Sequence, residues 1–279
     1  MSLIDCKSVR EEILGEILAK GYKNLKLVII STSDDPASKV YVRNKIKTAE
    51  SVGIAAEVIN CNPALLESVK ITLSYLAQDP SVTGIILQLP LAEHLKPYER
   101  ELLDLIPFEK DVDGLTSENM GRLWSGKPCL VPATAVGVMR LLPEDLSGKI
   151  VTVVNRSDLI GKPLIKLLLD RNATVKVCHS KTCNLRYETY SADIVIVGIG
   201  VPRFFGYYDF GPGRQTWIDC GINRDQDGKL CGDLDIDAFS LTFGKDVTPV
   251  PGGVGLLTTA QLMYNVMRAY ELQEGLSNA

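Results

Sequence analysis

A tyrosine and a lysine four residues apart are side chains whose types and spacing suggest chemistry in this 279-residue chain. Residues four apart on a helix lie on the same side, so Tyr41 and Lys45 can face one ligand together. A lysine, unlike an arginine, can give up its proton in surroundings that disfavour charge, and can then relay protons or orient water. On spacing alone, a tyrosine at the core edge and a solvated lysine is the simpler interpretation.

Two further polar residues, Gln88 and Asp113, could bind a ligand or could simply shape the local backbone. Gln88 lies in GIILQLPL (84–91), and Asp113 lies in EKDVDG (109–114). The amide can bond to nearby backbone, and an aspartate before glycine can form a turn. A carboxylate can also accept two parallel N–H bonds from a flat heterocycle and hold it in register. Both interpretations stay open on these residues alone.

A glycine-rich segment precedes the last apolar stretch. It reads TPVPGGVG (248–255) and contains Pro251, Gly252, Gly253 and Val254. Glycine permits positive φ, so a tight turn explains it structurally. The same turn also allows backbone to approach a ligand closely and to form the wall of a cleft.

The segment NRSDLIGKP (155–163) follows the apolar run 149–154, where a dinucleotide site carries G-x-G-x-x-G. Only Gly161 matches that fingerprint. Asn155 begins the segment, and asparagine is one of the few residues other than glycine that tolerate the left-handed region. A capped turn with Ser157 is the simpler interpretation.

A second polar segment follows the next apolar run. His179, Ser180 and Lys181 stand where an acidic residue would bond a ribose 2′-hydroxyl, which favours NADP over NAD. A zinc site at Cys178, His179 and Cys183 is disfavoured because the chain has only two histidines. We predict no metal site.

Helix-like and strand-like stretches alternate, which indicates an α/β fold with mainly parallel sheets. The predicted strands are 25–30, 55–60, 83–89, 149–154, 174–178, 193–198 and 216–221. The predicted helices are 5–20, one from about 36 capped by Asp34 or Asp35, one between strands 55–60 and 83–89, one from Gly161, a polar one between strands 174–178 and 193–198, and 256 to about 270.

A Pro-, Gly- and Asp-rich segment (107–132) interrupts this periodicity and suggests two domains. Residues 1–120, completed by 256–279, are predicted to form the substrate domain. Residues 121–255 are predicted to form a Rossmann-like nucleotide domain, with a cleft between the two.

Composition excludes several other functions. The formal net charge of −4 has no basic block, so nucleic acid is not an expected partner. No apolar run reaches the ~18–20 residues of a membrane span, and no leader pattern is seen. Seven cysteines without a C-x-x-C pair suit reduced, buried thiols, and we expect a cytoplasmic protein.

Four motifs in order, YVRNK (41–45), GIILQLPL, EKDVDG and TPVPGGVG, resemble the methylenetetrahydrofolate dehydrogenase/cyclohydrolase (FolD-type) family over nearly the whole chain. The resemblance implies NADP-dependent oxidation of 5,10-methylenetetrahydrofolate and hydrolysis of the methenyl product to 10-formyltetrahydrofolate. It also implies a homodimer.

The resemblance assigns roles on the substrate side. It implies that Lys45 is the catalytic lysine of the hydrolytic step, that Gln88 contacts it, that Asp113 holds the pterin and that Tyr41 stacks on the folate. The turn 251–254 is implied to line the substrate.

The family's G-R-S-x-x-V-G-x-P matches at Arg156, Ser157, Gly161 and Pro163. The resemblance places Arg156 and Ser180 near the 2′-phosphate. It also assigns to the cofactor Gly198, Gly200 and Ile222, the last near the nicotinamide.

Four departures from the family pattern put cofactor affinity and kinetics in question: Asn155, Ala133, Ala135 and Leu256. A monofunctional dehydrogenase is an alternative, because the presence of Lys45 does not by itself establish an efficient hydrolytic step. More distant alternatives are another two-domain dehydrogenase of the shikimate or amino-acid type, and a non-catalytic nucleotide-binding protein.

Overall fold

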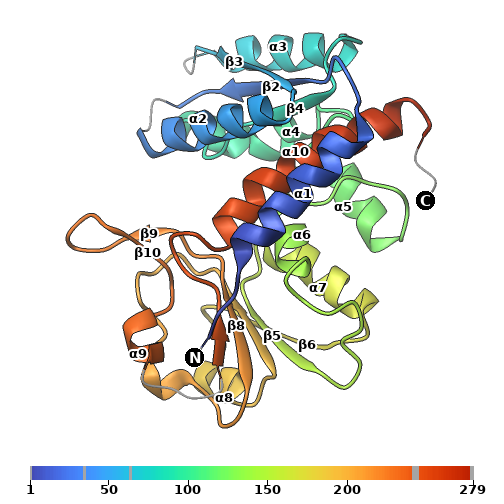
Figure 1. Cartoon of the computed structure of the whole chain (residues 1–279). Coiled ribbons are helices and arrows are strands. Elements are labelled where there is room, and N and C mark those ends of the chain that lie inside the picture. Colours follow the sequence, from blue (N-terminus) through green and yellow to red (C-terminus); the bar gives the residue numbers. More distant parts are fainter. Residues whose placement is uncertain (1, 34–35, 63–64, 241–244, 277–279) are drawn as a thin grey trace. The chain divides into compact units, whose positions relative to one another are not determined.

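The computed structural model describes residues 2–33, 36–62, 65–240 and 245–276. The chain divides into two compact units. The first unit comprises residues 12–133 and 259–279, and the second unit comprises residues 1–11 and 134–258. Each unit contains a parallel sheet with helices (Figure 1).

The first unit contains a three-stranded parallel sheet in the order β3-β2-β4. Its strands are β2 (Lys26–Ser31), β3 (Ala55–Asn60) and β4 (Gly84–Leu87). Its helical segments are α2 (Pro36–Ser51), α3 (Leu66–Gln78), η1 (Glu93–Tyr98), α4 (Glu99–Leu103), α5 (Ser117–Trp124), most of α1 (Cys6–Lys20) and the later part of α10 (Val254–Gln273). The strands and helices predicted for this region are confirmed, whereas Asp34 and Asp35 lie outside the described residues.

Strand β2 lies between its two neighbours and is apolar almost throughout. Val28, Ile30, Ile85 and Leu87 are all buried in one core cluster. A parallel strand covered on both faces reads as a continuous apolar run, which is why β2 was recognisable from sequence. Because β3 and β4 flank β2 on opposite sides, the strand order reverses between β2 and β4, and ligands bind at such points in open α/β sheets.

Helix α5 falls inside the segment that interrupted the sequence periodicity. Thr116 caps it by accepting a hydrogen bond from the Asn119 amide at 3.2 Å. The helix has only eight residues, which is shorter than the window of about 11–18 residues in which a helical period can be recognised from sequence.

The second unit contains a parallel sheet in the order β1-β11-β8-β7-β5-β6. Its strands are β1 (Ser2–Leu3), β5 (Ile150–Val154), β6 (Thr174–Cys178), β7 (Ile194–Val197), β8 (Gln215–Asp219) and β11 (Lys245–Val247). Its other elements are α6 (Ala133–Met139), α7 (Gly161–Asp170), α8 (Leu185–Tyr190), η2 (Tyr207–Asp209), the hairpin β9 (Asn223–Arg224) and β10 (Leu230–Cys231), and α9 (Ile236–Ser240).

The four strands predicted here are confirmed, and the order reverses between β5 and β7 as in a Rossmann-like sheet. Trp217 of β8 is fully buried, with Phe205 and Phe210 at ring-centroid distances of 5.6 and 5.1 Å. This aromatic cluster anchors β8 and the loop before it. Within the described residues, no helix has the length and apolar character needed to cross a membrane.

Candidate active site and dinucleotide loop

Three of the predicted site residues meet in the first unit. Lys45 projects from α2, the helix that follows β2, and Gln88 directly follows β4. The Lys45 Nζ donates to Gln88 Oε1 at 3.1 Å and lies 3.8 Å from Asp113 Oδ2. The Lys45 and Asp113 side chains are 14% and 21% exposed, so both are sheltered yet reachable. The reversal between β2 and β4 explains how residues 43 positions apart come together.

Gln88 is held in one orientation by backbone. Its backbone N–H donates to Ile30 O at 2.9 Å, and its side-chain Nε2 donates to Leu89 O at 2.6 Å. With Nε2 occupied in this way, Oε1 is the end of the side chain that faces Lys45. Gln88 therefore both bonds to nearby backbone and contacts Lys45, because the bond from Nε2 to the backbone orients Oε1 toward the lysine.

The two aspartates of EKDVDG, Asp111 and Asp113, have different surroundings. Asp111 is buried and accepts from the Thr116 amide at 2.8 Å and from Asn119 Nδ2 at 2.9 Å. Burial raises the pKa of Asp111, and these hydrogen bonds oppose the rise. Asp113 instead turns toward Lys45. The first carboxylate shapes the loop, and the second is available to a ligand.

Sequence reasoning missed residues that brace this loop. Asn265 of α10 is buried and donates from Nδ2 to the carbonyl oxygens of Val112 and Val131, each at 2.8 Å. Gly114 has a φ of +68°, and a Cβ there would lie 2.7 Å from Pro132 N. The signal available for Asn265 was a polar residue between apolar neighbours in the last helix.

Tyr41 lies one helical turn before Lys45 and is 41% exposed. Val42 and Ala49 of the same helix are buried. The helix therefore buries one face and leaves Tyr41 with surface for an aromatic ligand. Its stacking role stays a prediction.

In the second unit, the loop after β5 is built around the Asn155 side chain. Asn155 Oδ1 accepts from Ser157 N and Ser157 Oγ, each at 2.8 Å, and from Gly161 N at 3.0 Å. Its Nδ2 donates to the carbonyl oxygen of Gly198, which follows β7. The carboxamide thus bridges the ends of β5 and β7, where the strand order reverses.

The expectation that Asn155 uses the left-handed region is wrong. Among the residues that the structure describes, the non-glycine residues with positive φ are Asn24, Asn172 and Arg203, and Asn155 is not among them. The loop keeps its shape because the carboxamide supplies hydrogen bonds rather than because the backbone bends as glycine would.

Two of the predicted glycines have specific backbone reasons. A Cβ on Gly161 would lie 2.3 Å from Asn155 O, so only glycine fits at the start of α7. Gly200 has a φ of +72°, which glycine adopts without strain. Gly198 is less restricted, because its Cβ would lie 3.4 Å from Asn155 Nδ2.

Donor side chains also lie at the carboxyl ends of the strands of this sheet. Arg156 and Ser157 are exposed after β5, and Ser180 is exposed after the neighbouring β6. His179 is half-buried, and its Nδ1 accepts from the Lys181 amide at 3.1 Å. A guanidinium and hydroxyls at the carboxyl ends of adjacent parallel strands suit a phosphate ligand.

The glycine-rich turn before α10 is tight. Gly252 has a φ of +97°, and a Cβ on Gly253 would lie 2.1 Å from Pro249 O. Val254 begins α10 and is buried in the core of the second unit. Pro251 follows a cis peptide bond and is exposed. The structural interpretation of the turn holds, and its contact with substrate stays a prediction.

Ile222 lies beside the start of α10, since a Cβ on Gly255 would lie 3.2 Å from Ile222 Cδ1. Ile222 itself is 43% exposed. The departure at Leu256 has a local reason, because its amide donates to Gly253 O at 3.0 Å and proline has no such donor. Ala133 and Ala135 are buried in α6.

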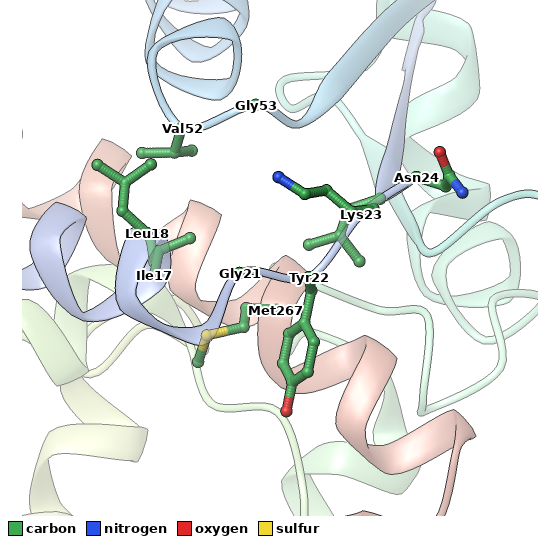
Figure 2. A pocket seen from close by; sticks show the side chains of 10 residues that line it. Ile17, Leu18, Gly21, Tyr22, Lys23, Asn24, Val52, Gly53 and Met267 are labelled. Carbon is green, nitrogen blue, oxygen red and sulfur yellow. The ribbon is translucent and has the colours of Figure 1, made fainter.

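A separate cavity of about 340 Å³ lies in the first unit (Figure 2). It is lined by Ile17 and Leu18 of α1, by residues 21–25, by Val52 and Gly53 after α2, and by Met267. None of the predicted substrate-side residues lines it, so it does not bear on the site around Lys45. Across the described parts of the chain, no group of three His, Cys, Asp or Glu side chains is arranged to hold a metal ion.

Comparison with protein families gives two matches. The catalytic-domain model of tetrahydrofolate dehydrogenase/cyclohydrolase matches residues 4–113, and the NAD(P)-binding-domain model of the same family matches residues 132–274. The chain belongs to this family. The resemblance seen in the motifs is confirmed, as are the α/β class with two domains and the expectation of a nicotinamide dinucleotide.

Curated relatives match along almost the whole chain. The bifunctional protein FolD of Dechloromonas aromatica is 40% identical over 285 residues, covering 98% of this chain and 99% of the relative. The bifunctional protein FolD of Streptococcus pneumoniae serotype 4 is 41% identical over 278 residues, covering 96% of each chain.

Solved structures of the family agree with this fold. The bifunctional FolD methylenetetrahydrofolate dehydrogenase/cyclohydrolase of Campylobacter jejuni has a TM-score of 0.91 at 35% identity, covering 98% of this chain and 99% of that chain. The Trypanosoma brucei enzyme, solved with NADP and an inhibitor, has a TM-score of 0.88 at 29% identity and covers 98% of both chains.

Proposed function

We propose that this chain oxidises 5,10-methylenetetrahydrofolate with NADP and hydrolyses the resulting 5,10-methenyltetrahydrofolate to 10-formyltetrahydrofolate. The observation that carries the proposal is the Lys45–Gln88–Asp113 cluster, formed in a chain that belongs to the tetrahydrofolate dehydrogenase/cyclohydrolase family. The cluster offers an ammonium, an amide and a carboxylate in one sheltered place, which is what an acid–base step on a polar heterocycle needs.

In the hydrolytic step, water adds to the electrophilic methenyl carbon, a proton leaves that water, and the ring opens to the formyl product. Lys45 orients the water and relays the proton, and Gln88 fixes the position of the lysine Nζ. Asp113, 3.8 Å from Nζ, helps to place the lysine and accepts N–H bonds from the amino-pyrimidinone edge of the pterin. Tyr41 offers a partly exposed ring for stacking on the folate.

The second unit supplies the groups that suit NADP. The glycine that α7 needs at its start, the exposed Arg156 and Ser157, and Ser180 after β6 form a polar rim at the strand ends. The absence of an acidic side chain in the segment after β6, His179 to Lys181, favours the 2′-phosphate form over NAD. When bound, NADP accepts a hydride from the methylene carbon of the folate. The chain's contribution to that step is chiefly to position the reactants.

The test follows purified protein with 5,10-methylenetetrahydrofolate and NADP or NAD. NADPH is read by fluorescence, and the methenyl product by absorbance after acid quenching. The wild type is compared with Lys45→Met and with Lys47→Met, a matched control that changes an exposed lysine on the same helix. We expect Lys45→Met to slow hydrolysis by about 100-fold or more and to accumulate methenyl product, while NADP reduction continues.

Each contrary outcome has a separate meaning. A wild type that reduces neither nucleotide would overturn the dehydrogenase assignment. A wild type that accumulates methenyl product as fully as Lys45→Met would identify a monofunctional dehydrogenase. Hydrolysis slowed equally by Lys47→Met would remove the special role of Lys45.

We further propose a homodimer and a cytoplasmic location. Strand β6 forms one edge of the sheet of the second unit, and Val177 on it is 39% exposed. An edge strand with exposed apolar side chains can pair with a second copy. All seven cysteines are free, and Cys183 is exposed, which suits a reducing compartment. Sedimentation of the wild type and of Val177→Lys tests the dimer, because a charge on that edge is expected to favour the monomer.

A further inference from the structure

A fully buried carboxylate secures the loop after β7. Asp233 Oδ2 accepts from Ile199 N at 2.5 Å and from Gly200 N at 3.3 Å, and its Oδ1 accepts from Val201 N at 3.0 Å. Three consecutive amides pointing to one place form a nest for an anion. Here the protein's own carboxylate fills it, so the loop is held by a side chain that lies more than 30 residues later.

The same carboxylate secures a second segment. Asn223 Nδ2 donates to Asp233 Oδ1 at 2.8 Å, and Asn223 adjoins Ile222. A Cβ on Gly221 would lie 2.4 Å from Asp233 Cγ, so the backbone after β8 passes directly against the carboxylate. The segments containing Gly200 and Ile222, both assigned to the cofactor by the family pattern, are therefore fastened to one side chain.

A second buried carboxylate supports the first. Asp219, at the end of β8, accepts from Gly221 N at 2.8 Å, Asp233 N at 3.2 Å and Leu234 N at 2.9 Å. A Cβ on Gly232 would lie 1.9 Å from Asp219 Oδ2. Asp219 thus fixes the backbone from which Asp233 projects.

The pair is costly to bury. Burial raises the pKa of Asp219 to about 7, with the nearby charge of Asp233 adding to the rise and the backbone N–H bonds opposing it. No lysine or arginine in the described residues forms an ion pair with either carboxylate. Buried carboxylates with a perturbed pKa and no charged partner are typical of functional sites.

We propose that Asp233, supported by Asp219, is a positioning residue for NADP, because one carboxylate sets the backbone of both the 199–201 loop and the 221–223 segment. The role rests on the proposed function and deepens it. Asp233 itself is fully buried and acts through the two segments, whose exposed Gly200 and Ile222 are the groups left to face the dinucleotide.

The test compares Asp233→Asn with Asp145→Asn. Asp145 also accepts from a backbone amide, that of Ser147, but it lies in the loop before β5, at the amino ends of the strands of the same sheet. Three quantities are measured: hydrogen exchange of amides 199–201 without ligand, the NADP dissociation constant by calorimetry, and hydrolysis of methenyltetrahydrofolate without NADP.

We expect Asp233→Asn to accelerate exchange at 199–201 and to weaken NADP binding, each by about tenfold or more, since charge-assisted bonds are lost. Hydrolysis should stay within about twofold of the wild type, because the Lys45 cluster belongs to the first unit. Asp145→Asn should leave all three unchanged. Faster exchange with unchanged NADP affinity would overturn the positioning role, as would no change in either.

A second variant guards against misfolding of the first. Asn223→Ala removes one donor to Asp233 from a half-buried side chain. It should raise the KM for NADP about threefold with little change in kcat, because a lost neutral donor has a small effect. An unchanged KM would count against the proposal. A wild type that fails to bind NADP at all would instead overturn the proposed function, so the two failures are distinguishable.

Discussion

Replacing Gly161 by alanine tests a close backbone contact between the start of α7 and the loop after β5. The new Cβ would lie 2.3 Å from Asn155 O, 2.5 Å from Asn155 C and 2.7 Å from Arg156 N. All three are backbone atoms, so no flexible side chain can move aside. Ordinary contacts need roughly 3.5 Å, so the loop must retreat by about 1 Å.

Overpacking of this kind costs about 1–3 kcal/mol. If the strain falls wholly on the cofactor-binding conformation, NADP affinity drops by a factor of about 5 to 150. Gly206→Ala is the control, because a Cβ at Gly206 meets no atom within 4 Å and its φ is −124°. Hydrolysis of methenyltetrahydrofolate should be the same in both variants and the wild type.

The assay is calorimetric titration with NADP, together with thermal unfolding of the ligand-free protein. We expect Gly161→Ala to bind NADP more weakly or to unfold at lower temperature, and Gly206→Ala to match the wild type in both. An affinity within about twofold of the wild type and an unchanged unfolding temperature would refute the argument that this contact restricts position 161 to glycine.

Two further predictions concern stability. Asn155→Gly restores the residue usual in the family but removes the acceptor for three donors. The second unit should therefore lose about 1–2 kcal/mol of unfolding free energy, measured by denaturant titration followed by the fluorescence of the buried Trp217. An unchanged midpoint would contradict this. Glu271 is buried, and although burial opposes the shift, hydrogen bonds from Lys20 and Tyr22 at 2.9 and 3.0 Å lower its pKa below 4.5. Its stabilisation is therefore present above the ordinary pKa and is lost as pH falls through the lowered one. Glu271→Gln should flatten the acid limb of a plot of unfolding temperature against pH, and an unaltered limb would exclude the role.

Much of the fold could be predicted from the sequence because its signals are local. The apolar runs of β2, β5 and β7 are buried on both faces and so appear as continuous hydrophobic stretches. The segments missed were those with weak local patterns, such as β1, which has two residues and gains its order by pairing with β11. Pairing partners of that kind lie at the other end of the chain and leave no local pattern.

Some features of the candidate site could likewise be predicted from the sequence, and others could not. Residue types and motif order alone were enough to nominate Lys45, Gln88 and Asp113 and to indicate the family. Residue type alone does not distinguish Asp111 from Asp113, because the two carboxylates stand two residues apart and differ only in what surrounds them after folding. The resemblance to the family is what singled out Asp113.

By itself, the sequence determined the α/β class, the two-part organisation and the chemistry that the side chains can offer. Tertiary structure alone decided that the Asn155 carboxamide bridges two strand ends, that Gln88 presents its oxygen to the lysine, and that Asp219 and Asp233 are buried against the backbone after β7 and β8. The physical reason is that hydrogen-bond partners separated by 30 to 45 residues, as in Asn155 with Gly198, are chosen by strand order and burial rather than by neighbours in the chain.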